Sequence, residues 1–329
     1  MRIDHGHAIG SPVRVRYSFL KLLTGSDLAW RRLPFMSAQS LQPGPAVWLT
    51  ACSHGDEVGG VIVIQEIFKR IRRQLLKGAV FAFPMMNPIG FEIASRELPL
   101  SREDLNRAFP GNPKGSLADR IADKIFSNIM QTQPTLVLDL HNDWRRSIPY
   151  CVIDPCAPSE AECLHEQVEQ FGRLTGLLLI QETEVLRHTL SWSLRQRGVP
   201  ALTLELGESN VVNEGNIECG TRSIWNLLAQ LGMVPPVAEP YRYVVPEPFQ
   251  GRILRYTDRP LSSSSGIIRF AARPGQVVRK GQVVARIYNT FGKLQETVTA
   301  PQPAIVLGQA DASIAFPGVP LVAFGVQEP

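Results

Sequence analysis

Short apolar runs and longer stretches with helical spacing alternate along the first two thirds of the chain. The apolar runs have the length of buried strands and lie at 45–52, 79–83, 135–141, 177–181 and 201–206. The stretches with apolar residues at helical spacing lie near 57–76, 116–130, 159–174, 189–197 and 215–231. Strands followed by helices with short connections predict an α/β fold whose sheet is largely parallel or mixed.

The rhythm breaks after the last of these helices. Residues 232–250 are rich in proline and show no helical period, which suits a linker. Beyond them, short apolar runs separated by glycine-containing turns predict a small all-β region of roughly 80 residues, within the usual range for a domain. We therefore expect a catalytic domain over 1–235, followed by a linker and a C-terminal β domain over 236–329.

The composition narrows the class of protein. The chain has 44% apolar and 19% charged residues, as ordinary globular proteins do. Its net charge of +4 comes from 34 basic and 30 acidic residues, a surplus too small to predict nucleic-acid binding. No apolar stretch has the length of a membrane span, and the N-terminus lacks the apolar core of a secretory signal. A cytoplasmic protein is expected, and the oligomeric state stays open, a homo-oligomer included.

Five cysteines, at positions 52, 151, 156, 163 and 219, contain no C-x-x-C pair. In a reducing compartment they are expected to be free thiols without a role.

Polar residues gather where predicted strands end. His54 and Glu57 follow the first apolar run, between glycines, and His141 ends a later one. Ligands collect at the carboxyl ends of strands in such sheets, and two imidazoles with a carboxylate suit a catalytic zinc ion. The spacing H-x-x-E alone is weak, because Ser53 or Asp56 could merely cap a helix whose dipole favours Glu57.

Glu205 ends another strand inside an apolar run. A buried carboxylate is costly unless it is paired, so it needs a function. Beside a metal-activated water it would serve as a general base, and the alternative is a structural salt bridge.

A connection of about 30 residues joins the second predicted strand to the next helix, and loops of this length are usually functional. It contains Arg96, a candidate donor to an oxyanion, and Asn106 with Arg107, candidates to clamp a carboxylate. Taken singly, each arginine could be an ordinary surface charge.

Together these motifs resemble the succinylglutamate desuccinylase/aspartoacylase family, a branch of the zinc carboxypeptidase-like hydrolases. The resemblance rests on Gly-Asp-Glu after the first histidine, Asn-Pro followed by Arg, Asp-Leu-Asn-Arg-x-Phe-Pro-Gly, Asp-Leu-His-Asn and Glu-Leu-Gly, in this order between about 50 and 208. It implies a zinc-carboxypeptidase-like mixed sheet flanked by helices, and the β-rich tail fits it too.

The resemblance also implies residue roles. One zinc ion per chain would be bound by His54, Glu57 and His141, with Glu205 as the base that activates water. Arg96 would stabilise the oxyanion. Asn106 and Arg107 would hold the substrate's α-carboxylate, with Asn142 as a further substrate contact. Asp139 or Asp143 could orient a ligand histidine.

One departure concerns specificity. After Asp-Leu-His-Asn the family often continues with a small residue, whereas this chain has Asp143-Trp-Arg-Arg146. We expect these residues to face the pocket and to change which substrate it accepts.

The tail resembles the barrel-sandwich fold of biotinyl and lipoyl carrier domains. Lys293 stands about where a carrier lysine would, but its neighbours Phe-Gly-Lys-Leu differ from a carrier motif, so it is interpreted as unmodified.

Three functions compete at this stage. The favoured one is a zinc-dependent deacylase of a small N-acyl amino acid. The second is a carboxypeptidase or amidase of the same superfamily acting on peptides. The third is an inactive binding protein on this fold, which is disfavoured because every expected catalytic position is filled. Zinc itself is an inference, since the same ligands bind other divalent ions.

Overall fold

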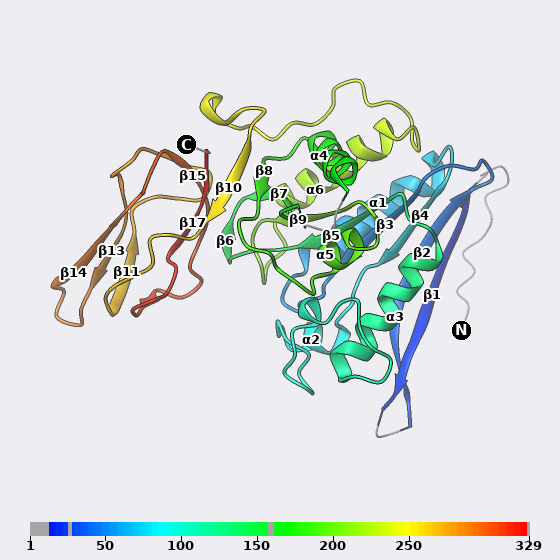
Figure 1. Cartoon of the computed structure of the whole chain (residues 1–329), viewed down its shortest axis with the longest axis horizontal. Helices are drawn as coiled ribbons and strands as arrows, with labels where there is room; N and C mark the ends of the chain where they lie inside the picture. Colours follow the sequence, from blue (N-terminus) through cyan, green and yellow to red (C-terminus); the bar gives the residue numbers. More distant parts are fainter. Residues whose placement is uncertain (1–12, 26–27, 157–160, 328–329) are drawn as a thin grey trace.

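The computed structural model of the chain describes residues 13–25, 28–156 and 161–327 (Figure 1). Its α-helices are α1 (Gly59–Gln74), α2 (Pro88–Glu92), α3 (Leu117–Gln131), α4 (Glu162–Thr175), α5 (Leu190–Arg195) and α6 (Glu214–Gln230). Two 3-10 helices cover Leu105–Arg107 and Glu247–Phe249. The strands of the first half are β1 (Val13–Thr24), β2 (Trp30–Ser40), β3 (Ala46–Ala51), β4 (Ala79–Phe83), β5 (Leu136–His141), β6 (Arg146–Ser147) and β7 (Pro149–Ile153). The later strands are β8 (Leu179–Gln181), β9 (Ala201–Leu206), β10 (Ile253–Thr257), β11 (Gly266–Phe270), β12 (Val277–Val278), β13 (Val283–Tyr288), β14 (Leu294–Thr299), β15 (Ala304–Gln309), β16 (Ile314–Ala315) and β17 (Val322–Val326).

A mixed sheet of 13 strands forms the centre of the molecule, in the order β1-β2-β4-β3-β5-β9-β7-β8-β10-β17-β15-β12, with β6 paired to β15. The four strands β4, β3, β5 and β9 run parallel to one another. A second sheet, β14-β13-β11-β16, is separate and belongs to the C-terminal region. The mixed α/β fold with an additional C-terminal β sheet, predicted from the alternation of apolar runs, is confirmed.

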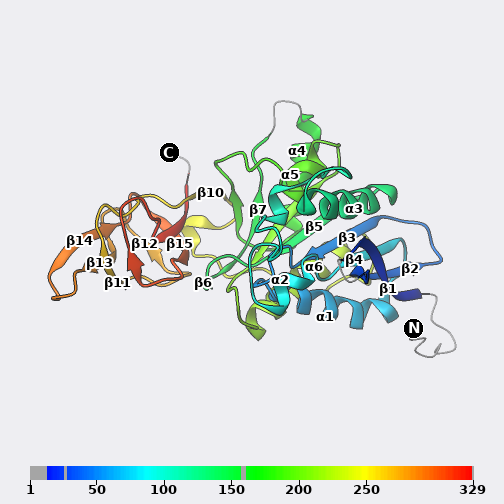
Figure 2. The same cartoon turned by 90° about the horizontal axis from the view of Figure 1, so that it is seen from below.

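Helices cover both faces of the central parallel strands (Figure 2). Helices α1, α4 and α6 pack on one face, where their apolar side chains join those of the sheet in one core. Helices α3 and α5 cover the other face in a second core. The central strands are therefore buried on both sides, which is why they appear in the sequence as continuous apolar runs rather than alternating ones.

The structure differs from the sequence-based expectation at both ends of the sheet. No element was predicted before residue 45, where β1 and β2 form a long antiparallel hairpin at one edge. At the other end, β10 pairs in parallel with β8, and β17, β15 and β12 continue the same sheet. Only β11, β13, β14 and β16 form the separate C-terminal sheet, on the far left of Figure 1. The boundary near residue 235 stays a prediction.

Among the described residues, none of the helices combines the length and the apolar character needed to cross a membrane.

The first turn of α1 lies so close to the sheet that it requires glycine. A Cβ atom added to Gly60 would lie 2.8 Å from the Cβ atoms of Ala51 and Leu140. Gly215 occupies the matching second position of α6, where the nearest neighbour of an added Cβ is Asn213 Oδ1 at 3.3 Å.

We expect Gly60→Ala to lower the free energy of unfolding by about 1–3 kcal/mol through overpacking, as measured by urea denaturation. Gly215→Ala is the control, because alanine gains the same helix propensity there without the collision. Equal effects of the two substitutions would contradict this account of the close approach.

Candidate metal centre and active site

The turn between β3 and α1 places His54 and Glu57 at the carboxyl edge of the parallel strands. The chain leaves the strand with Cys52 in the left-handed region (φ 54°). The backbone N–H of Glu57 then donates to the carbonyl of His54 at 3.2 Å, which closes a tight turn. Both side chains are almost completely buried, at 2% and 3% exposure.

Glu57 lies between two histidines. Its Oε1 is 2.6 Å from His54 Nδ1, and its Oε2 is 2.8 Å from Nδ1 of His141, the last residue of β5. One potential ligand atom from each of the three residues lies within 4.8 Å of the others. The neighbouring strands thus bring together the three side chains predicted as ligands, although they are up to 87 positions apart in the sequence.

Each imidazole is held from behind by a second carboxylate. His54 Nε2 lies 3.0 Å from Asp104 Oδ1, and His141 Nε2 lies 2.9 Å from Asp139 Oδ2. A carboxylate on the outer nitrogen fixes the tautomer and orientation of a histidine that binds metal through the other nitrogen. The contact of Asp139 was anticipated from the sequence, whereas the contact of Asp104 was missed.

The charges of this cluster are strongly coupled. Burial opposes ionisation of Glu57, but the two imidazoles hold its pKa well below the usual range. Burial would lower the pKa of His141, but the carboxylates of Asp139 and Glu57 raise it well above its ordinary value. Two imidazoles and a carboxylate, with their donor atoms converging, fit a divalent metal ion such as zinc.

Asp104→Asn keeps an oxygen that can accept from His54 and removes the negative charge behind it. We expect metal affinity to fall by about 10- to 100-fold, as measured by competition with a chromogenic chelator. A wild-type affinity in this variant would show that Asp104 does not support the cluster.

Glu205 stands opposite His141 in the register of β5 and β9, so both side chains point to the same face of the sheet. Its Oε2 is buried and has no hydrogen-bond partner among the described residues. Burial raises the pKa of Glu205 well above the usual value, and the negative charge of Asp143 adds to this effect. Glu205 therefore has a higher proton affinity than an ordinary carboxylate and an oxygen that is free to accept a proton.

Arg96 reaches the cluster from the long connection after β4. Its Nη2 donates to Asp104 Oδ2 at 3.0 Å, and its Nη1 lies 3.6 Å from Glu57 Oε1. The Arg96 side chain is half exposed, and it lines the cavity beside the cluster.

The side-chain amides of Asn106 and Asn142, both predicted from the sequence to contact substrate, form hydrogen bonds within the protein. Asn106 accepts from the backbone N–H of Leu190 at 2.9 Å and places Nδ2 at 3.3 Å from His141 Nε2. Asn142 accepts from the N–H of Gly59 at 3.0 Å and donates to the carbonyls of Gly207 and Glu208.

Arg107 is exposed, and its Nη1 donates to the carbonyl of Asn106 at 2.9 Å.

A cavity of about 250 Å³ opens beside Glu57 and Arg96. Its lining residues are Asp56, Glu57, Arg96, Asn142, Asp143, Trp144, Ser209 and Asp311. Of the four residues of the departure noted in the sequence, Asp143 and Trp144 line the pocket, whereas Arg145 and Arg146 are exposed and are not among its lining residues. Burial raises the pKa of Asp143 to about 7, offset in part by the Tyr150 hydroxyl, which donates to its Oδ2 at 2.6 Å. Asp56 was considered from the sequence only as a possible helix cap and as part of the Gly-Asp-Glu motif, and no sequence pattern marks Asp311 as part of this wall.

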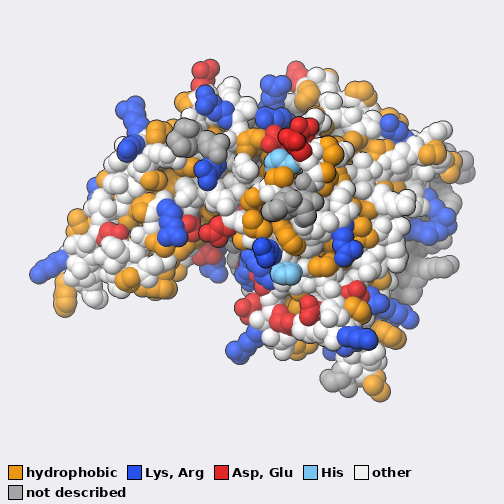
Figure 3. All heavy atoms as spheres, viewed as in Figure 1, with side chains coloured by type: hydrophobic (Ala, Val, Ile, Leu, Met, Phe, Trp, Pro, Cys, Tyr) orange, Lys and Arg blue, Asp and Glu red, His pale blue; other side chains and the backbone are white. Residues whose placement is uncertain are grey.

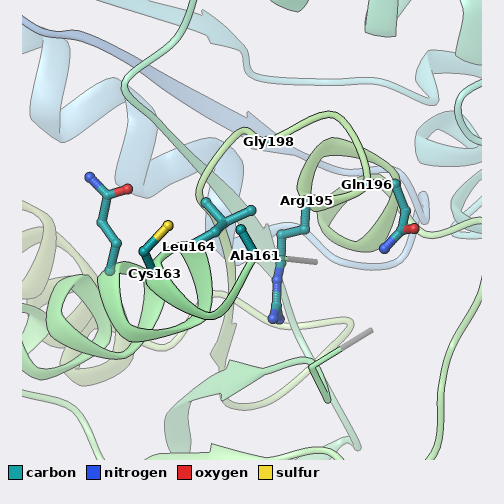
Figure 4. Close-up of a pocket in the computed structure, with 7 residues that line it drawn as sticks. Ala161, Cys163, Leu164, Arg195, Gln196 and Gly198 are labelled. Atoms are coloured by element: carbon teal, nitrogen blue, oxygen red, sulfur yellow. The ribbon is translucent and has the colours of Figure 1, made fainter. Parts of the chain in front are cut away.

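A larger cavity of about 350 Å³ lies elsewhere, between α4 and the residues after α5 (Figure 4). It contains no residue of the histidine cluster, and its buried Arg195 donates to the carbonyl of Asp154 and contacts His165 Nδ1. The surface shown in Figure 3 intersperses basic and acidic side chains, in agreement with the small net charge. The smaller cavity, which adjoins the cluster, is therefore the candidate active site.

Comparison with known proteins places this fold and site in a class. The structure superposes on a metallo-carboxypeptidase from Burkholderia cenocepacia with a TM-score of 0.54 and 16% identity, over 66% of this chain and 64% of the other. The fold is therefore carboxypeptidase-like. The family model "Succinylglutamate desuccinylase/Aspartoacylase catalytic domain" matches residues 43–231, more than half of the chain. The chain belongs to this family, as its motifs indicated.

Two relatives match over most of their length. An N-alpha-acetyl-L-2,4-diaminobutyric acid deacetylase from Halomonas elongata is 29% identical over 289 residues, covering 84% of this chain and 80% of that protein. The crystal structure of a succinylglutamate desuccinylase/aspartoacylase from Rhodobacter sphaeroides has a TM-score of 0.81 and 20% identity, with all of both chains covered. The likeness to the solved structure extends to the C-terminal β region.

Proposed function

We propose that this protein is a zinc-dependent amidohydrolase that removes the acyl group from a small N-acyl amino acid. The observation that carries the proposal is the cluster of His54, Glu57 and His141, whose ligand atoms lie within 4.8 Å of one another. The family to which the chain belongs supports it, and so does its similarity to the Halomonas relative, which is named as a deacetylase.

One zinc ion per chain would be held by His54, Glu57 and His141. When bound, it would polarise the scissile carbonyl and lower the pKa of a water molecule toward ~7. The contacts from Asp104 and Asp139 to the outer imidazole nitrogens support this assignment, because they orient both rings toward a common point.

Glu205 would act as the general base and then as the acid. Its unpartnered Oε2 and its raised pKa support this role, since such a carboxylate can take a proton from water and deliver it to the leaving amine. The alternative, a structural salt bridge, would need a cationic partner, and that oxygen has none among the described residues.

Arg96 would donate to the oxyanion that develops on the carbonyl, because its guanidinium faces the cavity beside Glu57. Asn106 and Arg107 would form the clamp for the α-carboxylate that the family resemblance implies. The exposed Arg107 guanidinium is the freer of the two, while Asn106 also supports His141. Asn142 would shape the cavity wall rather than donate to substrate, since its amide is engaged by backbone groups.

A small substrate fits this site better than a peptide. The cavity of about 250 Å³ is below the ~300–1,000 Å³ of sites for drug-sized ligands. This favours the deacylase over a carboxypeptidase with the same fold.

The test combines metal analysis of the purified protein with amine release from a panel of N-acetyl and N-succinyl amino acids. We expect about one zinc per chain and chelator-sensitive release from at least one panel member. A protein that neither contains nor takes up a divalent metal would overturn the proposal. Zinc without turnover of any N-acyl amino acid would overturn the assignment of the substrate class.

A further inference from the structure

We propose that the cavity selects N-acyl amino acids whose side chain ends in an amine, and that Asp143 and Asp311 bind this amine. The inference rests on the proposed deacylase function and adds a substrate class and two specificity-determining residues to it.

The two carboxylates come from distant parts of the chain. Asp143 follows β5 directly after the cluster, whereas Asp311 lies in the loop after β15, more than 160 residues later. Strand β6 pairs with β15, with Ser147 opposite Gly308 and Arg146 opposite Gln309. This pairing carries the loop of Asp311 to the cavity.

The loop is fixed there by close contacts. The backbone N–H of Arg145 donates to Asp311 Oδ1 at 2.7 Å. Trp144 packs so tightly on Gly308 that a Cβ atom there would lie 2.5 Å from its Cδ1. Asp311 is exposed to solvent, and these contacts fix its loop where the carboxylate lines the cavity.

The charge of the cavity lining favours a cation at Asp143 and Asp311. Of the other charged lining residues, Glu57 belongs to the metal cluster, Arg96 pairs with Asp104, and Asp56 adds a further carboxylate. Asp143 and Asp311 receive hydrogen bonds from neutral donors, the hydroxyl of Tyr150 and a backbone N–H. Neither carboxylate forms an ion pair with a described residue. An ammonium group would therefore gain charge-assisted hydrogen bonds and favour the ionised form of both acids, while a carboxylate would be repelled.

Within about 250 Å³ the cavity therefore combines Arg96 beside the metal cluster with two carboxylates that are not part of the cluster. The amide of the substrate would lie at Glu57 and Arg96, and a short aminoalkyl side chain would extend to Asp143 and Asp311. The Halomonas relative is named for a substrate of this class, an acylated diamino acid.

The test compares three substrates of similar size with zinc-loaded enzyme: the Nα-acetyl derivatives of L-2,4-diaminobutyrate, L-norvaline and L-glutamate. Their side chains end in an amine, a methyl group and a carboxylate. We expect the highest kcat/KM for the amine. Asp311→Asn and Asp143→Asn should each lower the ratio of kcat/KM for the amine over the methyl substrate by about 10- to 100-fold.

Asparagine keeps the size of the side chain and an oxygen that can accept from Arg145 N–H or the Tyr150 hydroxyl, so the wall should stay folded. Glu218→Gln, an exposed acid on α6, is the matched control and should leave the ratio unchanged. A preference of the wild type for the methyl or carboxylate substrate would overturn the inference, as would an unchanged ratio in both asparagine variants.

A binding measurement separates this inference from the deacylase proposal. Titration calorimetry with the free products should show tighter binding of L-2,4-diaminobutyrate than of L-norvaline, and the difference should shrink in Asp311→Asn. Turnover with no such preference would leave the deacylase standing and reject the amine pocket. The preference without turnover of any N-acyl substrate would do the reverse.

Discussion

Glu205→Gln should lower kcat by about 10²- to 10⁴-fold, the usual contribution of a positioned general base, while the zinc content stays at the wild-type level. The amide preserves the shape of the side chain but cannot accept a proton from water. Glu205 is not a member of the histidine cluster, so metal binding does not depend on it. Steady-state kinetics and metal analysis of the same preparation measure the two effects together.

The melting temperature of Glu205→Gln distinguishes a catalytic role of Glu205 from a structural one. The buried Oε2 of Glu205 has no partner, and burying such a group is costly. The variant should therefore unfold at the same temperature as the wild type or a higher one. A lower melting temperature with wild-type kcat would identify Glu205 as a structural residue, and Glu218→Gln serves as the control for removing an acid.

Glu57→Gln should weaken metal binding so far that the protein loses its metal during dialysis, and turnover with it. Glu57 contacts both histidines, and an amide is a poor metal ligand. Zinc sites bind with apparent free energies of ~10–16 kcal/mol, so the loss of one of a few ligands corresponds to an affinity loss on the order of 10²- to 10³-fold. Metal content after dialysis against a weak chelator, followed by the deacylation assay, measures this.

The control for Glu57→Gln is His165→Gln. His165 lies on α4 beside Arg195 and Glu169, away from the cluster, and should keep the metal. Retention of one zinc per chain in Glu57→Gln would show that the three residues do not form the binding site.

The predicted strands and helices that carry the cluster agree with the structure because their sequence signals are local. The run ending at Ala51 and the run ending at His141 are buried on both faces, so they appear as unbroken apolar segments. Parallel strands end at one edge, and this places polar residues at their carboxyl ends together.

Other features depend on long-range pairing that no local pattern encodes. Strand β1 is an exception, because apolar and polar residues alternate from Val13 to Phe19, a local strand signal that the sequence-based prediction did not use. The loop of Asp311 reaches the cavity through the pairing of β6 with β15. This pairing could not be predicted, because β6 has only two residues and β15 lies far from it in the sequence. Asp104 belongs to a motif that was noticed, but its contact with His54 follows from the fold of a long connection.

The continuation of the main sheet into β10 has a consequence for synthesis on the ribosome. The residues from His54 to Glu205 are made before β10, and Asp311 follows about 100 residues after Glu205, or roughly 5–20 s later at ~5–20 residues per second. Until then β8 lacks its neighbour β10 and presents the open edge of a nearly finished sheet, which can pair with another chain. The nascent protein is therefore most prone to aggregation in the interval when its metal ligands are already present and its C-terminal strands are not.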